Sequence, residues 1–261
     1  MTKNIAHSRK IKLLNIAQRD NKRYQQLLVR YFHECFLRRL SMSPYREHLI
    51  LKGGSLLFAF EDLLPRPTLD IDFTGNRIDN DPESLKTVFA EIMLQPGVDD
   101  GVIFFPHSLN TEAITVDKKY PGTRISFKAS LDTIEKTLVM DIGFGDVITP
   151  GPVSMKYPTI FDESGEICLS AYSLETVVAE KFQTLIDRSV NNSRMKDFFD
   201  LYRILSTRVE QNKRAQRVCF AEPGDYFGHH IFYGAIFLAL GQKNRPIKNK
   251  NMAVKSHGSD D

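Results

Sequence analysis

The chain has 261 residues, of which 42% are hydrophobic and 26% charged, with 15 Gly and 12 Pro. This length and composition suit one large domain or two small ones, and they exclude a disordered, collagen-like or coiled-coil chain. The three cysteines form no CxxC pair, which argues against a disulfide framework and a thiolate zinc site. The N-terminus is charged where a signal peptide is apolar, and the longest apolar run, residues 231–240, is too short to span a bilayer. We therefore expect a cytoplasmic protein with no membrane partner.

The net charge of +3 hides an uneven distribution along the chain. Residues 1–39 hold ten basic and two acidic side chains, residues 40–202 hold 15 and 25, and residues 203–261 hold ten and five. An acidic centre is typical of a divalent-metal site, and basic flanks attract a polyanion by counterion release. The basic N-terminal stretch is equally well explained as the solvated face of a helix.

Hydrophobic periodicity predicts helices and strands along the first 210 residues. Helices are expected over residues 5–40, with a break near Asp20 and Asn21, and over residues 55–64, 82–93, 173–188 and 195–205. Strands are expected just before Gly53 and over residues 69–74, 102–105, 113–116, 124–128 and 138–144. Residues 145–158 are rich in Pro and Gly and are expected to form a loop. The fold class that follows is α+β, with a small mixed sheet flanked by helices.

This pattern divides the chain into four parts. They are a basic helical segment at residues 1–48, an α/β core at 49–160, a helical region at 161–210 and an irregular tail at 211–261. The tail mixes Gly, His, aromatic and Lys residues without sustained periodicity. We expect it to be aberrant, as the end of a truncated or frameshifted reading frame would be, which leaves the helical C-terminal part incomplete.

Three aspartates carry the predicted chemistry. Asp70 and Asp72 are two residues apart on one expected strand, so both side chains leave the same face. Carboxylates this close repel each other unless a cation lies between them, and oxygen ligands suit Mg²⁺. Asp141 lies in a second apolar strand, LVMDIGF, and one sheet can bring all three within reach of two metal ions. On its own, the Asp-Ile-Asp triplet is better explained as a solvated acidic strand end.

A glycine-rich turn accompanies the aspartates. Gly53, Gly54 and Ser55 stand at the expected start of a helix, where free N–H groups and the Ser55 hydroxyl favour a phosphate oxygen. A tight turn is the simpler explanation of the two glycines taken alone. Neither a P-loop nor a GxGxxG fingerprint is present, so the common nucleotide-binding folds have no support.

Five segments carry a family resemblance, in this order: LKGGSLLFAF, RPTLDIDF, LVMDIGF, ETVVAEKFQTLIDR and NSRMKDFFDLY. Over residues 51–205 they resemble the AbiEii/AbiGii-type nucleotidyltransferase toxin family, a branch of the DNA polymerase β-like nucleotidyltransferase superfamily. The resemblance implies a nucleotide and metal site at the glycine-serine turn and the Asp pair, with Asp141 as the third carboxylate. It also implies nucleotide-binding roles for residues of the later motifs, which are Lys181, Arg194, Lys196, Asp197 and Asp200.

The later motif residues also fit that role physically. Lys181 on a helix would supply a compact cation for the β- or γ-phosphate. Asp200 is four residues from Lys196 and three from Asp197, so the three share one helix face. Surface ion pairs are the alternative explanation of this spacing. Arg124, which follows a Tyr-Pro-Gly turn, is a further candidate near the site.

These features predict a metal-dependent nucleotidyltransferase that moves a nucleoside monophosphate from an NTP to an acceptor hydroxyl. Asp70, Asp72 and Asp141 are the expected magnesium ligands, Asp141 also deprotonates the hydroxyl, and Lys181 is the fourth catalytic residue. The resemblance implies the toxin of a toxin–antitoxin or phage-defence system, a cognate antitoxin, and RNA, such as tRNA, as one acceptor. The alternative acceptors are a protein side chain and a small molecule. The rivals are a non-catalytic nucleotide- or RNA-binding module with a truncated C-terminus and a metal-dependent phosphohydrolase.

Overall fold

The structure is a computed structural model that describes residues 4–60, 67–96, 98–114, 122–148, 151–161, 163, 165–188 and 195–218. The sheet lies in a compact unit that spans Met1–Gln211. The helices are α1 (Ile5–Arg19), α2 (Tyr24–Met42), α3 (Gly53–Leu56), α4 (Pro82–Met93), α5 (Leu174–Arg188) and α6 (Met195–Val218). The strands are β1 (Leu49–Lys52), β2 (Asp70–Gly75), β3 (Val102–Ile114), β4 (Gly122–Leu131), β5 (Ile134–Phe144), β6 (Val153–Tyr157) and β7 (Ile167–Ala171).

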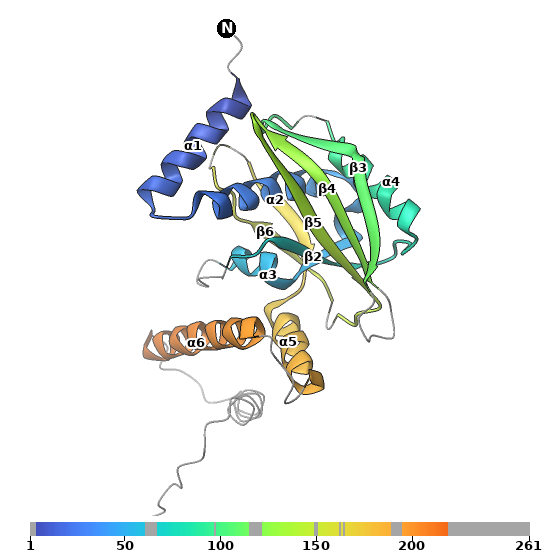
Figure 1. Cartoon of the computed structure of the whole chain (residues 1–261). Helices are drawn as coiled ribbons and strands as arrows, with labels where there is room; N and C mark the ends of the chain where they lie inside the picture. The colour runs from blue at the N-terminus through green and yellow to red at the C-terminus, as the bar shows by residue number, and fades with distance from the viewer. Residues whose placement is uncertain are drawn as a thin grey trace, which may run out of the picture. The chain divides into compact units, whose positions relative to one another are not determined.

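Within the described residues, seven strands form one mixed sheet in the order β3-β4-β5-β2-β1-β7-β6 (Figure 1). β2 runs parallel to β5 and β1 runs parallel to β7, while the other neighbouring strands are antiparallel. The predicted mixed sheet with flanking helices is thus confirmed. No helix in the described ranges has both the length and the apolar character that crossing a membrane requires.

Several helices begin or end where the sequence predicts. α1 ends at Arg19 and α2 begins at Tyr24, which confirms the expected break, and Asn21 between them has a positive φ of 49°. α4 carries Pro82 in its first turn, and the Asp81 side chain accepts a hydrogen bond from the backbone of that turn. Short polar residues that cap or interrupt a helix are therefore reliable signals in this sequence.

Two strands were missed by the sequence analysis. β6 lies in the segment expected to be a loop, and β7 lies in the region expected to be helical. The exposure of the side chains does alternate along both strands. In β7, Ile167, Leu169 and Ala171 are buried and the residues between them are more exposed. Each spans only five residues, so the Pro and Gly signals around β6 and the helical residues after β7 dominate the local pattern.

Several other elements differ in length from the prediction. The helix expected to end at residue 205 is α6, which runs to Val218, so residues 211–218 of the expected irregular tail are helical and the rest of that tail lies outside the described residues. The strands expected at residues 102–105 and 113–116 form one strand, β3, whose register against β4 shifts between Phe105 and Asn110. The helix expected from Ser55 onward is a single turn, α3, followed by a 3₁₀ turn. Residues 61–64 of that expected helix lie outside the described residues.

One face of the sheet packs against α2 and α4. Phe36 of α2 stacks on Phe89 of α4 with ring centroids 5.4 Å apart, and both rings lie near Phe127 of β4. Phe73 of β2 points into this core and is fully buried. Because side chains alternate along a strand, Asp72 leaves the opposite face. Because the apolar side chains of β2 pack on one face, its polar side chains lie on the other.

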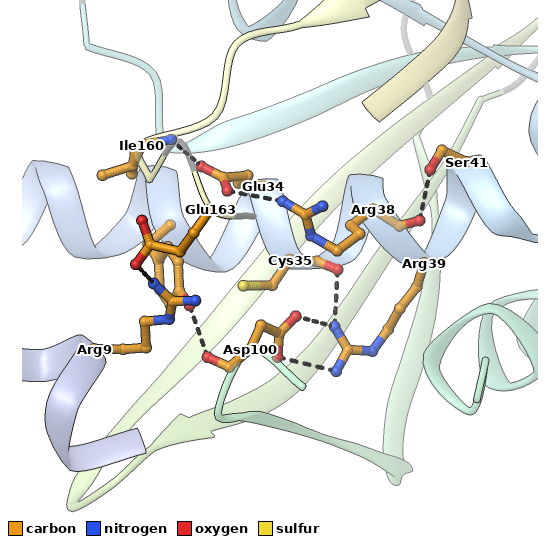
Figure 2. A network of polar contacts seen from close by, with 10 residues as sticks. Arg9, Glu34, Cys35, Arg38, Arg39, Ser41, Asp100, Ile160 and Glu163 are labelled. Atoms are coloured by element: carbon orange, nitrogen blue, oxygen red, sulfur yellow. Dashed lines mark hydrogen bonds and ion pairs between the residues drawn. The ribbon is translucent and has the colours of Figure 1, made fainter. Parts of the chain in front are cut away.

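A buried ion pair fastens α2 to the entry of β3 (Figure 2). The Arg39 guanidinium donates to the two carboxylate oxygens of Asp100 at 2.6 and 3.2 Å, and also to the main-chain carbonyls of Cys35 and Val102. The Tyr31 hydroxyl donates to the Asp100 carbonyl at 2.7 Å. Arg39 and Asp100 are only 5% and 7% exposed, so hydrogen bonds have to compensate for their lost hydration.

We predict that Arg39→Met lowers the free energy of unfolding by about 3–5 kcal/mol, because it leaves the buried Asp100 charge without its partner. Urea denaturation of the full chain measures this. The control is Lys156→Met, which breaks the Lys156–Glu166 pair whose side chains are 72% and 68% exposed. That variant should lose less than about 1 kcal/mol. Equal losses in the two variants would contradict a buried, energetically important pair.

Candidate active site

The register of the sheet aligns charged side chains in one row. Lys52 at the end of β1 is paired with Asp72 of β2, and Asp72 is paired with Asp141 of β5. On the far side, Asp141 is paired with Arg124 of β4. Paired residues of neighbouring strands lie about 5 Å apart and point to the same face. The sheet thus brings Asp72 and Asp141 together, and Asp70, two residues before Asp72, lies on the same face.

The diglycine turn stands against Asp72. Gly53 follows β1 directly with φ +66°, and a Cβ atom there would lie 2.0 Å from Oδ2 of Asp72. Only glycine lets the backbone approach the carboxylate this closely in this conformation. Gly54 and Ser55 are buried in the same turn, and the Ser55 hydroxyl donates to the main-chain carbonyl of Asp70 at 2.8 Å. The turn is thereby fixed to the start of β2, and the contact of Ser55 with a phosphate stays a prediction.

Asp72 is surrounded by charges of both signs. Burial, and after it the charge of Asp70, raises the pKa of Asp72 to about 6. Asp141 raises this pKa as well, while Lys52 and Lys196 lower it. The negative charges near Asp72 therefore outweigh the positive ones, and an added cation would stabilise the ionised carboxylate.

Lys52 is a cation of the site that the sequence analysis missed. Its ammonium nitrogen lies 2.5 Å from Oδ2 of Asp146 and 3.0 Å from Oε1 of Glu180, and the residue is 8% exposed. Burial by itself lowers the pKa of Lys52, but Glu180, Tyr172 and Asp146 together raise it above its ordinary value. Lys52 is therefore a permanently charged group. Its only signal in the sequence is its position at the end of an apolar strand, directly before the diglycine.

Hydrogen bonds hold Asp146 in place beside Lys52. The Thr74 hydroxyl donates to Asp146 at 3.0 Å, and the Tyr172 hydroxyl donates to the same oxygen at 3.2 Å. The Thr74 and Tyr172 hydroxyls are also 2.6 Å from each other. These contacts join β2, the end of β5 and the chain that leaves β7. The position of Lys52 is therefore set by three separate parts of the chain.

Arg124 of β4 engages the third aspartate. Its Nε and Nη2 atoms each donate to one carboxylate oxygen of Asp141 at 2.8 Å. Thr68 similarly donates its hydroxyl hydrogen to Oδ1 of Asp70 at 2.7 Å. In the part of the chain that the structure describes, no group of three or more His, Cys, Asp or Glu side chains is arranged around a common metal position. The predicted ligands are neighbours, but Asp70 and Asp141 have protein partners.

The three aspartates nonetheless fit a divalent cation chemically. Carboxylate oxygens are hard ligands of the kind that Mg²⁺ prefers. Burial, and after it the charge of Asp70, raises the pKa of Asp72, and a cation beside the carboxylate would counter both effects. Asp70 and Asp72 would hold the cation from β2, and Asp141 would hold it from β5.

Lys181 of α5 is buried between two aspartates of α6. Its ammonium nitrogen donates to Asp197 at 3.0 Å and to Asp200 at 2.8 Å, and the three residues are at most 8% exposed. This cluster joins α5 to α6 and uses two of the three N–H donors of the ammonium, so the contact of Lys181 with a phosphate stays a prediction. Lys196 of the same helix is exposed, and its charge lowers the pKa of Asp72 on the sheet. Arg194 lies outside the described residues.

We predict that Gly53→Ala is far more disruptive than a matched change at Gly165, which has φ +76°. Both variants strain the backbone by about 1 kcal/mol, but an added Cβ at Gly165 meets only Arg38 at 3.9 Å, whereas at Gly53 it collides with Asp72. Gly53→Ala should therefore cost about 1–3 kcal/mol more in urea denaturation. Equal costs would mean that the backbone does not approach Asp72 closely.

Several solved structures are similar to part of this chain. A "putative nucleotidyltransferase" from H. pylori is 16% identical, with a TM-score of 0.43 over 67% of this chain and 66% of that one. JHP933 from Helicobacter pylori is 16% identical, with a TM-score of 0.42 over 68% and 64%. The antibiotic-resistance factor ANT(2″)-Ia is 14% identical, with a TM-score of 0.33 over 72% and 96%. The chain thus spans just under two thirds of the length of the first two.

Comparison with the sequences of curated proteins gives no match. A family model, however, matches residues 35–253, which is more than half of the chain. The match includes β1, the aspartates of β2 and β5, and the later motifs on α5 and α6. It also extends beyond the five segments that carry the resemblance in the sequence. The chain therefore belongs to the family described as the nucleotidyl transferase AbiEii toxin of type IV toxin–antitoxin systems.

Proposed function

We propose that this chain transfers a nucleoside monophosphate from an NTP to an acceptor hydroxyl. The observation that carries the proposal is the pairing of Asp72 with Asp141 across parallel strands, directly beside the Gly53 turn. Carboxylates that lie together on one face of the sheet, next to a glycine turn, suit the charge neutralisation and positioning that phosphoryl transfer needs. Membership of a nucleotidyl transferase family supports the same chemistry.

The reaction exchanges one bond to phosphorus for another. The acceptor hydroxyl oxygen forms a bond to the α-phosphorus, and the bond from the α-phosphorus to the oxygen that bridges to the β-phosphate breaks. Pyrophosphate leaves with the electron pair of that bond, and the hydroxyl proton passes to a carboxylate oxygen of Asp141. Divalent cations such as Mg²⁺, when held by Asp70, Asp72 and Asp141, would supply Lewis-acid neutralisation of the triphosphate.

The remaining residues bind and position the nucleotide in this proposal. Gly53 lets the backbone of the turn lie directly against Asp72, and Lys52 keeps a fixed positive charge next to the same carboxylate. Lys196 adds positive charge from α6, which the buried Lys181 cluster attaches to α5. The proposed nucleotide contacts are Gly53, Gly54, Ser55, Lys181, Arg194, Lys196, Asp197 and Asp200.

We also propose a biological setting for this activity. The family description names a toxin of a type IV toxin–antitoxin system, which supports a cognate antitoxin. A role in phage defence is part of the same proposal. RNA, with tRNA as one class, is the proposed acceptor, because the first 39 residues carry ten basic and only two acidic side chains. Arg38 and Arg39 are buried in ion pairs, so the other eight basic side chains would meet the RNA. A protein hydroxyl is the alternative acceptor.

We predict that Asp72→Asn abolishes nucleotide transfer but leaves the fold intact, because it removes one charge at a partly buried position and keeps the side-chain shape. The assay incubates the chain with each α-labelled NTP, total RNA and Mg²⁺, and follows the label into RNA or protein. The variant should lose at least about 100-fold in rate. The control is Asp79→Asn, an exposed position outside the site, which should keep full activity.

The same assay separates the rival functions. Undiminished transfer by folded Asp72→Asn would contradict the proposed site. Release of free phosphate instead of pyrophosphate would indicate a phosphohydrolase, and nucleotide binding without turnover in the unmodified chain would indicate a binding module.

We predict that Asp72→Asn raises the stability of the cation-free protein at neutral pH. The folded-state pKa of Asp72, about 6, exceeds the ordinary value of 3.8, so the folded chain keeps a proton that the unfolded chain has lost. The free energy of unfolding therefore falls as pH rises from about 4 to 7. The variant escapes this loss and should be more stable by about 1–3 kcal/mol at pH 7.5 in a chelator, but not at pH 4. Parallel stability-against-pH curves for the two proteins would contradict the raised pKa.

A further inference from the structure

Arg124 lies between two carboxylates on the open face of the sheet. The register pairs Arg124 of β4 with Asp141 of β5 on one side and with Glu112 of β3 on the other. All three side chains therefore leave the same face, and each carboxylate is one strand away from the guanidinium. Arg124 is thus placed to reach either carboxylate by a change of rotamer.

In the structure Arg124 is paired with Asp141. Both oxygens of Asp141 accept hydrogen bonds from the guanidinium at 2.8 Å, so the carboxylate directs its lone pairs at Arg124. A divalent cation at Asp141 would meet both this occupied carboxylate and a positive charge. The pair therefore opposes cation binding at the third predicted ligand.

The ion pair between Arg124 and Asp141 lies where Arg124 can change its partner. The side chains of Arg124 and Asp141 are 45% and 21% exposed, so water reaches both partners and can replace their hydrogen bonds when the pair opens. Glu112 is exposed and accepts a hydrogen bond from Asn110 at 3.1 Å, an interaction that water can replace. A second carboxylate of equal charge is therefore available to Arg124 at small cost.

Lys52 lies in the same row of charged side chains, but its ammonium group is held in one position. It is 8% exposed and its ammonium contacts Asp146 and Glu180, which come from different parts of the chain. Lys52 therefore has no freedom to leave. The row has an immobile cation at the end next to Asp72 and an exchangeable one at the end next to Asp141.

We propose that Arg124 is a positioning residue that holds Asp141 in the cation-free protein and passes to Glu112 when a divalent cation engages Asp141. This inference rests on the proposed function, because it takes Asp141 as a cation ligand. Glu112 then acts through Arg124 and has no contact with substrate. Arg124 prevents the repulsion between Asp141 and the other carboxylates until the cation replaces it.

The test measures Mn²⁺ binding to the full chain without nucleotide, by electron paramagnetic resonance of the free ion. Arg124→Gln frees Asp141 and should tighten Mn²⁺ binding about three- to tenfold. Glu112→Gln removes the alternative partner, leaves Arg124 on Asp141, and should weaken binding about two- to fivefold. A residue with a merely structural role would not give tighter binding when it is removed.

Two further variants distinguish exchange from general electrostatics. The double variant Arg124→Gln/Glu112→Gln should bind Mn²⁺ as tightly as Arg124→Gln alone, because Glu112 acts only through Arg124. The matched control is Lys128→Gln, on the same strand and face, which breaks a 3.0 Å pair with Glu135 at 54% and 55% exposure. It should leave Mn²⁺ affinity unchanged. If Arg124→Gln does not fold, Arg124→Lys keeps the charge, loses the two-point contact, and should tighten binding about twofold.

Unchanged or weaker Mn²⁺ binding by Arg124→Gln would overturn the inference, as would additive effects in the double variant. Asp72→Asn separates this failure from failure of the proposed function. If Asp72→Asn abolishes Mn²⁺ binding while Arg124→Gln has no effect, only the exchange of Arg124 is wrong. If the unmodified chain binds no Mn²⁺, the cation site and the exchange are both wrong.

Discussion

The parallel pairing of β2 with β5 is the constraint on which the rest of the site depends. β3, β4 and α4 separate the two strands in sequence, yet their register places Asp72 beside Asp141. The neighbouring residues Phe73 and Ile142 are fully buried on the opposite face. A slip of one residue in either strand would turn an aspartate into the core. Apolar packing against α2 and α4 therefore holds two like charges together, although their mutual repulsion opposes it.

Burial decides how each cation around these aspartates behaves. Lys52 is enclosed by acidic and hydroxyl groups and stays charged in one position. Arg124 is about half exposed and makes a pair that solvent can replace. The buried Lys181 joins α5 to α6, and the charge of Lys196 lowers the pKa of Asp72 on the sheet. Similar positive charges thus serve as a permanent counter-ion, an exchangeable one and a structural tie.

The sequence predicted the parts of the fold and site that depend on local pattern. Alternation along β2 and β5 identified the strands and the face of their aspartates, since a strand's own residues decide it. β7 was missed because its place is set by parallel pairing with β1, more than 100 residues earlier in the chain. Lys52 was missed for a similar reason: it becomes part of the site only through its register with Asp72 and its contact with Glu180. Spacing placed Asp197 and Asp200 on one helix face, but it does not reveal that a lysine of another helix lies between them.

Anomalous scattering from Mn²⁺ in crystals of the full chain, grown with a non-hydrolysable NTP analogue, tests the central claim most directly. We expect Mn²⁺ density in contact with carboxylate oxygens of both Asp72 and Asp141, next to the Gly53 turn. Mn²⁺ bound elsewhere would contradict the claim. So would carboxylates of Asp72 and Asp141 that lie on opposite faces of the sheet or on strands that are not neighbours.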